Sequence, residues 1–187
     1  MIIGGKEFDT ENNTYIMGIL NVTPDSFSDG GKYNNMDAAL RHAEQMIQEG
    51  ADILDVGGES TRPGHMQITD EEEAERVVPV IRALKKEFDV PVSVDTYKST
   101  VAEAALEAGA DLVNDIWGLK YDPGMAAVIA GHDAACCLMH NRINTEYENF
   151  LADFMEDMKE CVRLAAQAGI EKEKIILDPG VGFGKTY

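Results

Sequence analysis

The stretch Gly50-Ala51-Asp52-Ile53-Leu54-Asp55 returns almost unchanged as Gly109-Ala110-Asp111-Leu112-Val113-Asn114. In both copies a glycine stands where a helix would end, and a short apolar run typical of a buried strand follows it. Each run closes on a polar residue. The repeat therefore predicts a helix-then-strand unit that one fold uses more than once.

Further copies of this unit extend along the chain. Thr69 with Glu72, and Thr100 with Glu103, each match the capping box that begins a helix. Helices are predicted over 36–49, 69–88, from 100 onward, 123–131 and 151–165. Strands are expected to begin near residues 15, 51, 91, 112, 135 and 174.

Strands that alternate with helices favour a parallel sheet within a single domain, 1–187. No G-x-G-x-x-G follows the first strand, so a dinucleotide-binding sheet is not supported. An α/β fold of the TIM (β/α)8 barrel type is the leading prediction. Such a barrel needs eight strands and the chain offers about six, so either the sequence is a fragment or the sheet is open.

Composition narrows the class of partner. Acidic residues outnumber basic ones 34 to 16, and a formal charge of -18 would repel nucleic acid or an anionic membrane. Small-molecule partners are expected instead. With no secretory leader and no apolar run of about 20 residues, a cytoplasmic protein is expected. Cys136, Cys137 and Cys161 lack zinc-ligand spacing and are interpreted as buried, reduced thiols.

The polar residues at the ends of the predicted strands are the candidates for a site, because the active site of a barrel lies at the carboxyl ends of its strands. Asp and Asn also end strands merely by making turns or capping helices, and for any one of them the two explanations are equally good. Five of six strand ends together favour a site. The candidates are Asn21, the loop 57–64, Asp95, Asn114 with Asp115, His140 and Asp178.

Two glycine-containing loops have competing interpretations. Backbone amides and Arg62 in the loop 57–64 suit an anion such as phosphate, although a solvated turn explains the loop equally well. Gly184-Lys185-Thr186 follows a strand and invites a P-loop interpretation. That interpretation fails, because the first glycine of the motif would fall on Pro179.

Taken together, several blocks in order resemble the dihydropteroate synthase family, the folate-pathway enzymes that sulfonamides inhibit. The resemblance spans essentially the whole chain, and its first two blocks are highly specific. The blocks are Met17-Gly-Ile-Leu-Asn-Val-Thr-Pro-Asp-Ser-Phe-Ser-Asp-Gly-Gly31, Asp55-Val-Gly-Gly-Glu-Ser-Thr-Arg-Pro-Gly64, Val92-Ser-Val-Asp-Thr96, Val113-Asn-Asp-Ile116, Leu177-Asp-Pro-Gly180 and Gly182-Phe-Gly-Lys185.

The resemblance implies a pterin-binding TIM barrel and a transferase. The enzyme condenses 6-hydroxymethyl-7,8-dihydropterin pyrophosphate with p-aminobenzoate to 7,8-dihydropteroate and pyrophosphate. Asp178 and Asn114 match the residues that bind the pterin edge. Asp95 matches the aspartate that stabilises the cationic pterin, while Arg62, Asn21 and a Mg²⁺ ion take the pyrophosphate, with Asn21 as the metal ligand.

The remaining matched positions surround the second substrate. Thr61, Pro63 and Phe183 match positions around the p-aminobenzoate ring, and Met139 is expected to pack against the pterin. Phe27 and Asp29 lie in the first loop, which closes over the site in the family. For Lys185 a solvated loop lysine is favoured over a catalytic one, and His140 is equally well explained by backbone hydrogen bonding and by ligand contact.

The family's later motifs, a Ser-Arg-Lys-Ser-like stretch and an Arg-x-His, do not occur in this sequence. The chain is therefore expected to form a C-terminally incomplete barrel with unpaired edge strands and weak turnover, and to belong to a longer natural protein that is a homodimer. Two alternatives stay open, a corrinoid-dependent methyltransferase domain with the same pterin site and a non-catalytic pterin-binding barrel.

Overall fold

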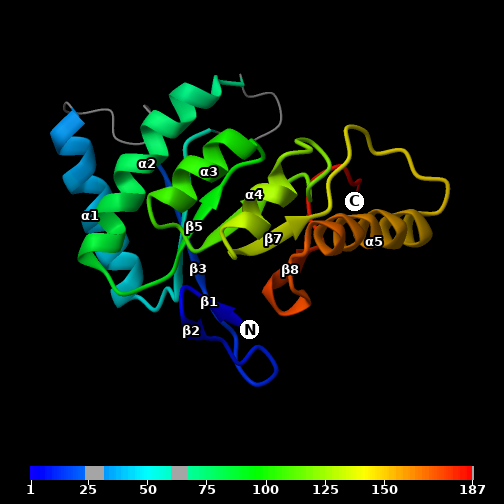
Figure 1. Cartoon of the computed structure of the whole chain (residues 1–187), viewed down its shortest axis with the longest axis horizontal. Coiled ribbons are helices and arrows are strands. Elements are labelled where there is room, and N and C mark those ends of the chain that lie inside the picture. The colour runs from blue at the N-terminus through cyan, green and yellow to red at the C-terminus, as the bar shows by residue number, and fades with distance from the viewer. Residues whose placement is uncertain (24–31, 60–66, 187) are drawn as a thin grey trace.

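A six-stranded parallel sheet forms the centre of the molecule (Figure 1). The computed structural model describes residues 1–23, 32–59 and 67–186, with the backbone alone for 32–35. The strands pair in chain order, so each contacts the next one along the sequence. They are β3 (Met17–Asn21), β4 (Ile53–Gly57), β5 (Val92–Asp95), β6 (Leu112–Asp115), β7 (Ala135–Met139) and β8 (Ile175–Asp178).

Helices cover one face of this sheet and follow one another across it (Figure 1). This arrangement confirms the predicted βα repeat and the TIM-type fold, of which six strands are described here. All six expected strands are confirmed. The helices are α1 (Lys32–Gln48), α2 (Asp70–Glu87), α3 (Ser99–Glu107), α4 (Met125–Gly131) and α5 (Phe150–Ala168), and a short 3₁₀ turn, η2 (Lys172–Lys174), precedes β8.

Successive side chains of a strand point to opposite faces, and the two faces of this sheet differ in chemistry. The face toward the helices is apolar apart from the buried Asp115, and it includes Leu54, Val56 and Val94, all fully buried. On the opposite, inner face the amino-terminal halves of the strands are apolar too, as at Ile53 and Leu112. Polar side chains occupy the carboxyl-terminal half of that inner face.

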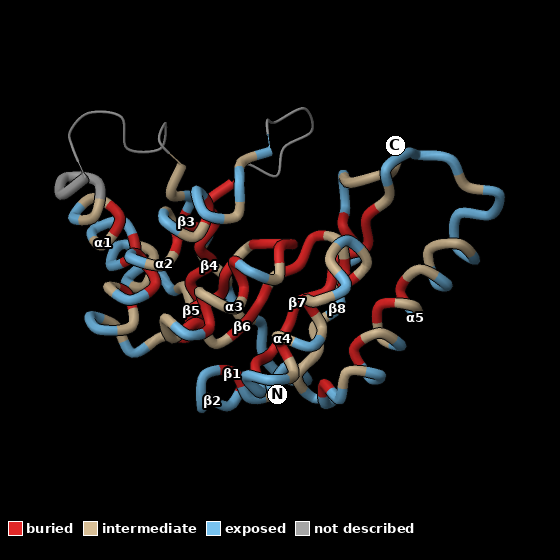
Figure 2. Tube along the Cα trace, turned by 45° about the horizontal axis from the view of Figure 1, so that its top comes forward, coloured by how far each residue is buried: buried red, intermediate tan, exposed pale blue. Residues whose placement is uncertain are grey.

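An N-terminal hairpin that the sequence did not reveal covers the apolar half of the inner face. Strands β1 (Ile2–Ile3) and β2 (Lys6–Glu7) pair antiparallel, and Ile3 and Phe8 pack against Ile53 and Leu112. Figure 2 shows the hairpin below the sheet, at the amino ends of its strands. With two residues in each strand, the hairpin is too short for a period-two pattern to stand out.

The first of the two predicted helix caps is confirmed and the second is wrong. Thr69 accepts a hydrogen bond from the Glu72 backbone N–H, and the Glu72 carboxylate accepts one from the Thr69 N–H. Thr100 instead lies inside α3, whose first residue is Ser99. The Ser99 N–H donates to Asp122 Oδ2 at 2.7 Å. The carboxylate of a residue distant in sequence therefore caps this helix, in place of the Thr100 hydroxyl.

The three cysteines are buried and unpaired, as predicted. Burial raises the pKa of Cys136 and of Cys137 to about 12, so both stay protonated thiols at neutral pH. Among the described helices, none is both long and apolar enough to span a bilayer.

Replacing the two threonines tests the caps against each other. Thr69→Ala removes the acceptor of an orphan N–H of α2 and is expected to lower the free energy of unfolding by about 1 kcal/mol. Thr100→Ala, on the exposed side of α3, is expected to cause no loss. Urea unfolding of both variants measures the difference, and equal losses would contradict the assignment.

Candidate functional site

Most of the predicted strand-end residues lie on one face of the sheet. Asp115 is the exception, because it pairs with Leu138 on the helix side and its buried carboxylate accepts from the Trp117 and Leu119 N–H groups. The strand registers pair Asn21 with Gly57, Gly57 with Asp95, and Asp95 with Asn114. Residues paired in a parallel ladder share a face, so all of these point inward. Met139 pairs with Asp178 two positions beyond the inward-facing Cys137 and Ile176, and both therefore point inward as well.

Asp55 belongs to the same group, although the strand-end criterion missed it. It lies two residues before Gly57, is 3% exposed, and its Oδ2 accepts a hydrogen bond from Asn114 Nδ2 at 3.1 Å. This bond fixes the orientation of the Asn114 amide and leaves its Oδ1 as an acceptor. A signal was present in the sequence, because Asp55 holds the position in the first repeat that Asn114 holds in the second.

Two carboxylate oxygens in this group are buried without a hydrogen-bond partner among the described residues, Asp55 Oδ1 and Asp95 Oδ1. Burial raises the pKa of Asp95 well above its ordinary 3.8, and the nearby Asp55 and Glu73 charges raise it further. Burial also raises the pKa of Asp55. Buried acceptors of this kind are expensive unless a donor reaches them, so the site is built for a ligand with N–H groups or positive charge.

Asn21 lies on the open side of this group. It is exposed, and its Oδ1 lies on one side of Gly57 with the Asp95 carboxylate on the other, so that a side chain at position 57 would contact both. Glycine therefore keeps the space between the amide and the carboxylate free.

An apolar wall continues the site toward β7 and β8. Met139, Tyr97 and Ile116 form a small buried cluster, and Trp117 and Phe183 pack against it while keeping partial exposure. Aromatic and thioether side chains suit a flat aromatic ligand. Polar groups on one side and an apolar wall on the other thus face the same space.

Five predicted site residues lie outside the described residues: Phe27, Asp29, Thr61, Arg62 and Pro63. The residues beside the segment 60–66 are held by hydrogen bonds. Glu59 Oε2 accepts from Lys98 Nζ at 2.7 Å and from the Ile68 N–H at 3.0 Å, and the Lys98 ammonium also donates to Ile68 O at 2.8 Å. These bonds join the chain before and after 60–66.

The Lys98 ammonium, which links Glu59 and Ile68 across the segment 60–66, is buried between two glutamates. We call this group of bonds the junction. Lys98 Nζ also lies 2.7 Å from Glu73 Oε2, and the three side chains are at most 5% exposed. Burial alone would favour the neutral amine, but the bonds to Glu59 and Glu73 raise the pKa of Lys98. Removing one member would leave a buried charge unpaired, which typically costs about 3–5 kcal/mol.

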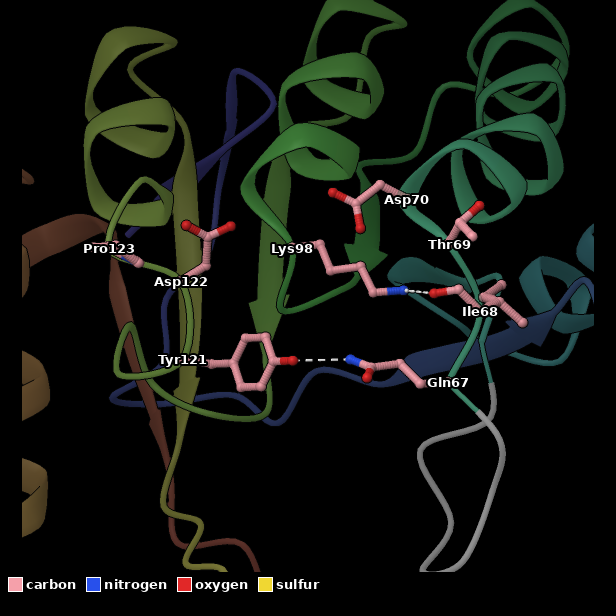
Figure 3. A pocket seen from close by; sticks show the side chains of 8 residues that line it. All are labelled: Gln67, Ile68, Thr69, Asp70, Lys98, Tyr121, Asp122 and Pro123. Carbon is pink, nitrogen blue, oxygen red and sulfur yellow. Dashed lines mark hydrogen bonds between the residues drawn. The ribbon is translucent and has the colours of Figure 1, made fainter.

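A separate pocket of about 460 Å³ lies beside this junction, between the start of α2 and the segment that precedes α4 (Figure 3). Gln67 reaches across it to the Tyr121 hydroxyl at 2.9 Å. None of the predicted site residues lines this pocket, and its Lys98 ammonium is already engaged, so the strand-end group is the better candidate site.

His140 and Lys185 lie behind the apolar wall. His140 is fully buried, with Nε2 3.0 Å from Asp157 of α5 and Nδ1 2.9 Å from Lys185 Nζ. Burial, followed by the Lys185 charge, lowers the pKa of His140, and burial also lowers the pKa of Lys185. The His140 ring therefore contacts the Asp157 and Lys185 side chains rather than the backbone groups that the sequence suggested for it.

Comparisons with known proteins agree with this geometry. The sequence model of the pterin binding enzyme family matches residues 17–187. The chain therefore belongs to the pterin-binding enzyme family.

Within that family, the similar proteins are dihydropteroate synthases. One from Clostridium beijerinckii is 62% identical over 187 residues, which are 100% of this chain and 70% of that protein. The structure of one from Clostridium difficile, in the presence of pteroic acid, has a TM-score of 0.93 and 55% identity, covering 96% of this chain and 69% of that one.

A third relative extends the range of ligands. The structure of a Xanthomonas albilineans dihydropteroate synthase with 4-aminobenzoic acid has a TM-score of 0.87 and 43% identity, over 94% of this chain and 64% of that one. This chain thus spans roughly two thirds of its relatives' length.

Asp95→Asn is expected to raise the free energy of unfolding at neutral pH. Native protein retains a proton on Asp95 that the unfolded chain has released, so stability falls as pH rises from 3.8 through the raised folded pKa. The neutral amide avoids this loss, about 1.4 kcal/mol for each unit of pKa shift. Urea unfolding between about pH 4 and pH 7 measures it.

Glu44→Gln, on the exposed side of α1, serves as the control for this charge change. An Asp95→Asn variant that loses stability with pH as steeply as the wild type would show that Asp95 is ionised in the folded protein.

Proposed function

We propose that this chain carries the pterin half-site of a dihydropteroate synthase and that its protein condenses 6-hydroxymethyl-7,8-dihydropterin pyrophosphate with p-aminobenzoate. Similarity over the whole chain to dihydropteroate synthases supports the proposal. The observation that carries it is the pair of unpartnered, buried carboxylate oxygens on Asp55 and Asp95 beside an oriented Asn114 amide.

A pterin edge supplies the hydrogen-bond donors that the Asp55, Asp95 and Asn114 group lacks. It presents N–H donors next to ring acceptors, and the free Asn114 Oδ1 and the Asp178 carboxylate accept such donors. Asp178 Oδ1 already accepts from the Gly180 N–H at 2.8 Å, which orients the carboxylate and leaves Oδ2 for the ligand. Met139 then packs against the flat face of the ring.

Asp95 is assigned to the charge that develops during the reaction. Positive charge builds on the pterin methylene as its C–O bond to pyrophosphate breaks, and an ionised carboxylate nearby stabilises it. Burial beside Asp55 holds the Asp95 pKa high in the free protein. A cationic pterin reverses that preference, so the interaction strengthens as the transition state forms.

Arg62, Asn21 and Mg²⁺ are assigned to bind the departing pyrophosphate. Magnesium usually keeps several waters and binds through one or two protein oxygens plus substrate phosphates. The exposed Asn21 amide oxygen fits that requirement as a single hard donor, and the described residues hold no group of three or more acidic, His or Cys ligands that would bind a metal alone. When bound, the ion supplies charge neutralisation to the leaving group.

The second substrate is placed against the apolar wall. Phe183 borders that wall in the structure, and Thr61 and Pro63 are assigned to the same ring by the resemblance. The weakly basic aromatic amine needs orientation more than a strong base, so positioning supplies much of the rate acceleration. Phe27 and Asp29 are assigned to the loop that covers the site.

The setting is proposed as the cytoplasm and the assembly as a homodimer. Three free, buried thiols suit a reducing compartment. The homodimer is supported by the family resemblance alone.

Two other functions would use the same pterin pocket. A corrinoid-dependent methyltransferase domain would not need the Thr61-Arg62 anion loop, and a non-catalytic barrel would not need to keep every strand-end residue. Asn21, Asp95, Asn114 and Asp178 are all retained and point to one face. That retention favours the synthase.

Pyrophosphate release by the full-length protein in the presence of Mg²⁺ tests the function directly, because residues 1–187 alone are expected to turn over weakly. Release is expected only when the pterin pyrophosphate and p-aminobenzoate are both present. Asp95→Asn is expected to lower kcat/KM about 10²–10³-fold, because it removes charge stabilisation of the transition state. Pterin binding without any release would instead support the non-catalytic barrel.

Asn21→Ala is expected to raise the Mg²⁺ concentration needed for half-maximal rate while leaving the affinity for a pterin without pyrophosphate unchanged. The amide oxygen interacts with the metal and leaving group rather than the ring. A magnesium titration of the rate, combined with calorimetric titration of free pterin, separates the two. Loss of pterin affinity would contradict the assigned metal role.

A further inference from the structure

The Lys185 side chain turns back onto its own loop. Its ammonium donates to the backbone carbonyls of Gly180 at 2.9 Å and Phe183 at 2.8 Å, and lies 3.3 Å from His140 O. The His140 Nδ1 atom completes the set at 2.9 Å. An ammonium has three N–H groups, so four acceptors leave it no hydrogen for a substrate.

His140 is oriented to receive this ammonium. Its Nε2 pairs with Asp157 Oδ2, and the same oxygen accepts from Arg142 Nε at 2.6 Å. An ionised carboxylate only accepts, so Nε2 carries the imidazole proton and Nδ1 presents its lone pair to Lys185. The chain of contacts thus links the loop after β8 to helix α5.

This link fixes the two site residues that the loop carries. Asp178 begins the loop, and its backbone oxygen accepts from the His140 N–H at 2.9 Å. Phe183 lies three residues after Gly180. Gly180 has a φ of 63° and lies so close to His140 O that a side chain at position 180 would not fit. Both residues are therefore held against the segment after β7.

We propose that Lys185 is a positioning residue, a latch that with His140 holds the 178–185 loop so that Asp178 and Phe183 face the two substrates. The proposal rests on the proposed function for the identity of those substrates. It assigns Lys185 neither to solvent nor to the reacting atoms, the two alternatives that the sequence offered.

Amide hydrogen exchange tests the latch without any substrate. The Gly180 N–H donates to Asp178 Oδ1 and the Phe183 N–H to Gly180 O, so both amides report on the loop. Lys185→Met is expected to speed exchange of these two amides by roughly tenfold or more, while the amides of α5 keep their protection. Lys172→Met, on an exposed lysine, is the matched control.

Steady-state kinetics test the consequence for the reaction. Lys185→Met is expected to raise the KM for p-aminobenzoate by roughly tenfold, with a smaller change in kcat, because Phe183 loses its fixed place. His140→Asn keeps an acceptor near Nδ1 and is expected to retain most of the wild-type KM. His140→Leu removes the acceptor and is expected to behave like Lys185→Met.

The two measurements separate failure of the latch from failure of the function. Unchanged loop exchange in Lys185→Met overturns the latch whether or not the protein is active. Faster exchange with an unchanged KM for both substrates shows that the loop does not position them, which also overturns the proposal. A full-length wild-type protein that releases no pyrophosphate contradicts the proposed function alone, and loop exchange still decides the latch.

Discussion

The six strands run parallel and pair with their chain neighbours in one continuous ladder, and that pairing sets the position of every candidate group that lies on a strand. Because the side-chain period is two, the register of Gly57 with Asp95, and of Asp95 with Asn114, sends all three to the inner face. A slip of one residue in β5, for example, would replace Asp95 on the inner face with the fully buried, apolar Val94. The strand register that packs the core therefore also brings the site residues together.

That requirement has an energetic cost at the carboxyl ends. Asp55, Asp95 and Asn114 lie where an apolar inner face would bury more hydrocarbon, and two of their oxygens lack partners among the described residues. Functional sites commonly retain such local instability, which a bound ligand relieves. The buried Lys98 between two glutamates is the opposite case, because there the charges are neutralised by the protein itself and the chain geometry beside residues 60–66 is fixed.

Sequence patterns predicted the features that depend on residues close together in the chain. Apolar runs gave the strands, the Thr69 box gave a cap, and the strand-end rule gave Asn21, Asp95, Asn114 and Asp178. The rule missed Asp55 because that residue precedes the end of its run, and the Thr100 cap was wrong because a carboxylate 23 residues away reaches the same helix. The reaction itself came from family resemblance, since strand-end acids alone suit many ligands.

Trp117 is the only tryptophan in the sequence, and it stands beside Met139 and Phe183 at the border of the apolar wall. Its indole is partly exposed and packs against that wall, so its surroundings change when the wall is covered. The ring centre of Tyr121 lies 6.1 Å from that of Trp117. Intrinsic fluorescence thus becomes a local optical probe of occupancy, which needs neither an added dye nor an engineered label.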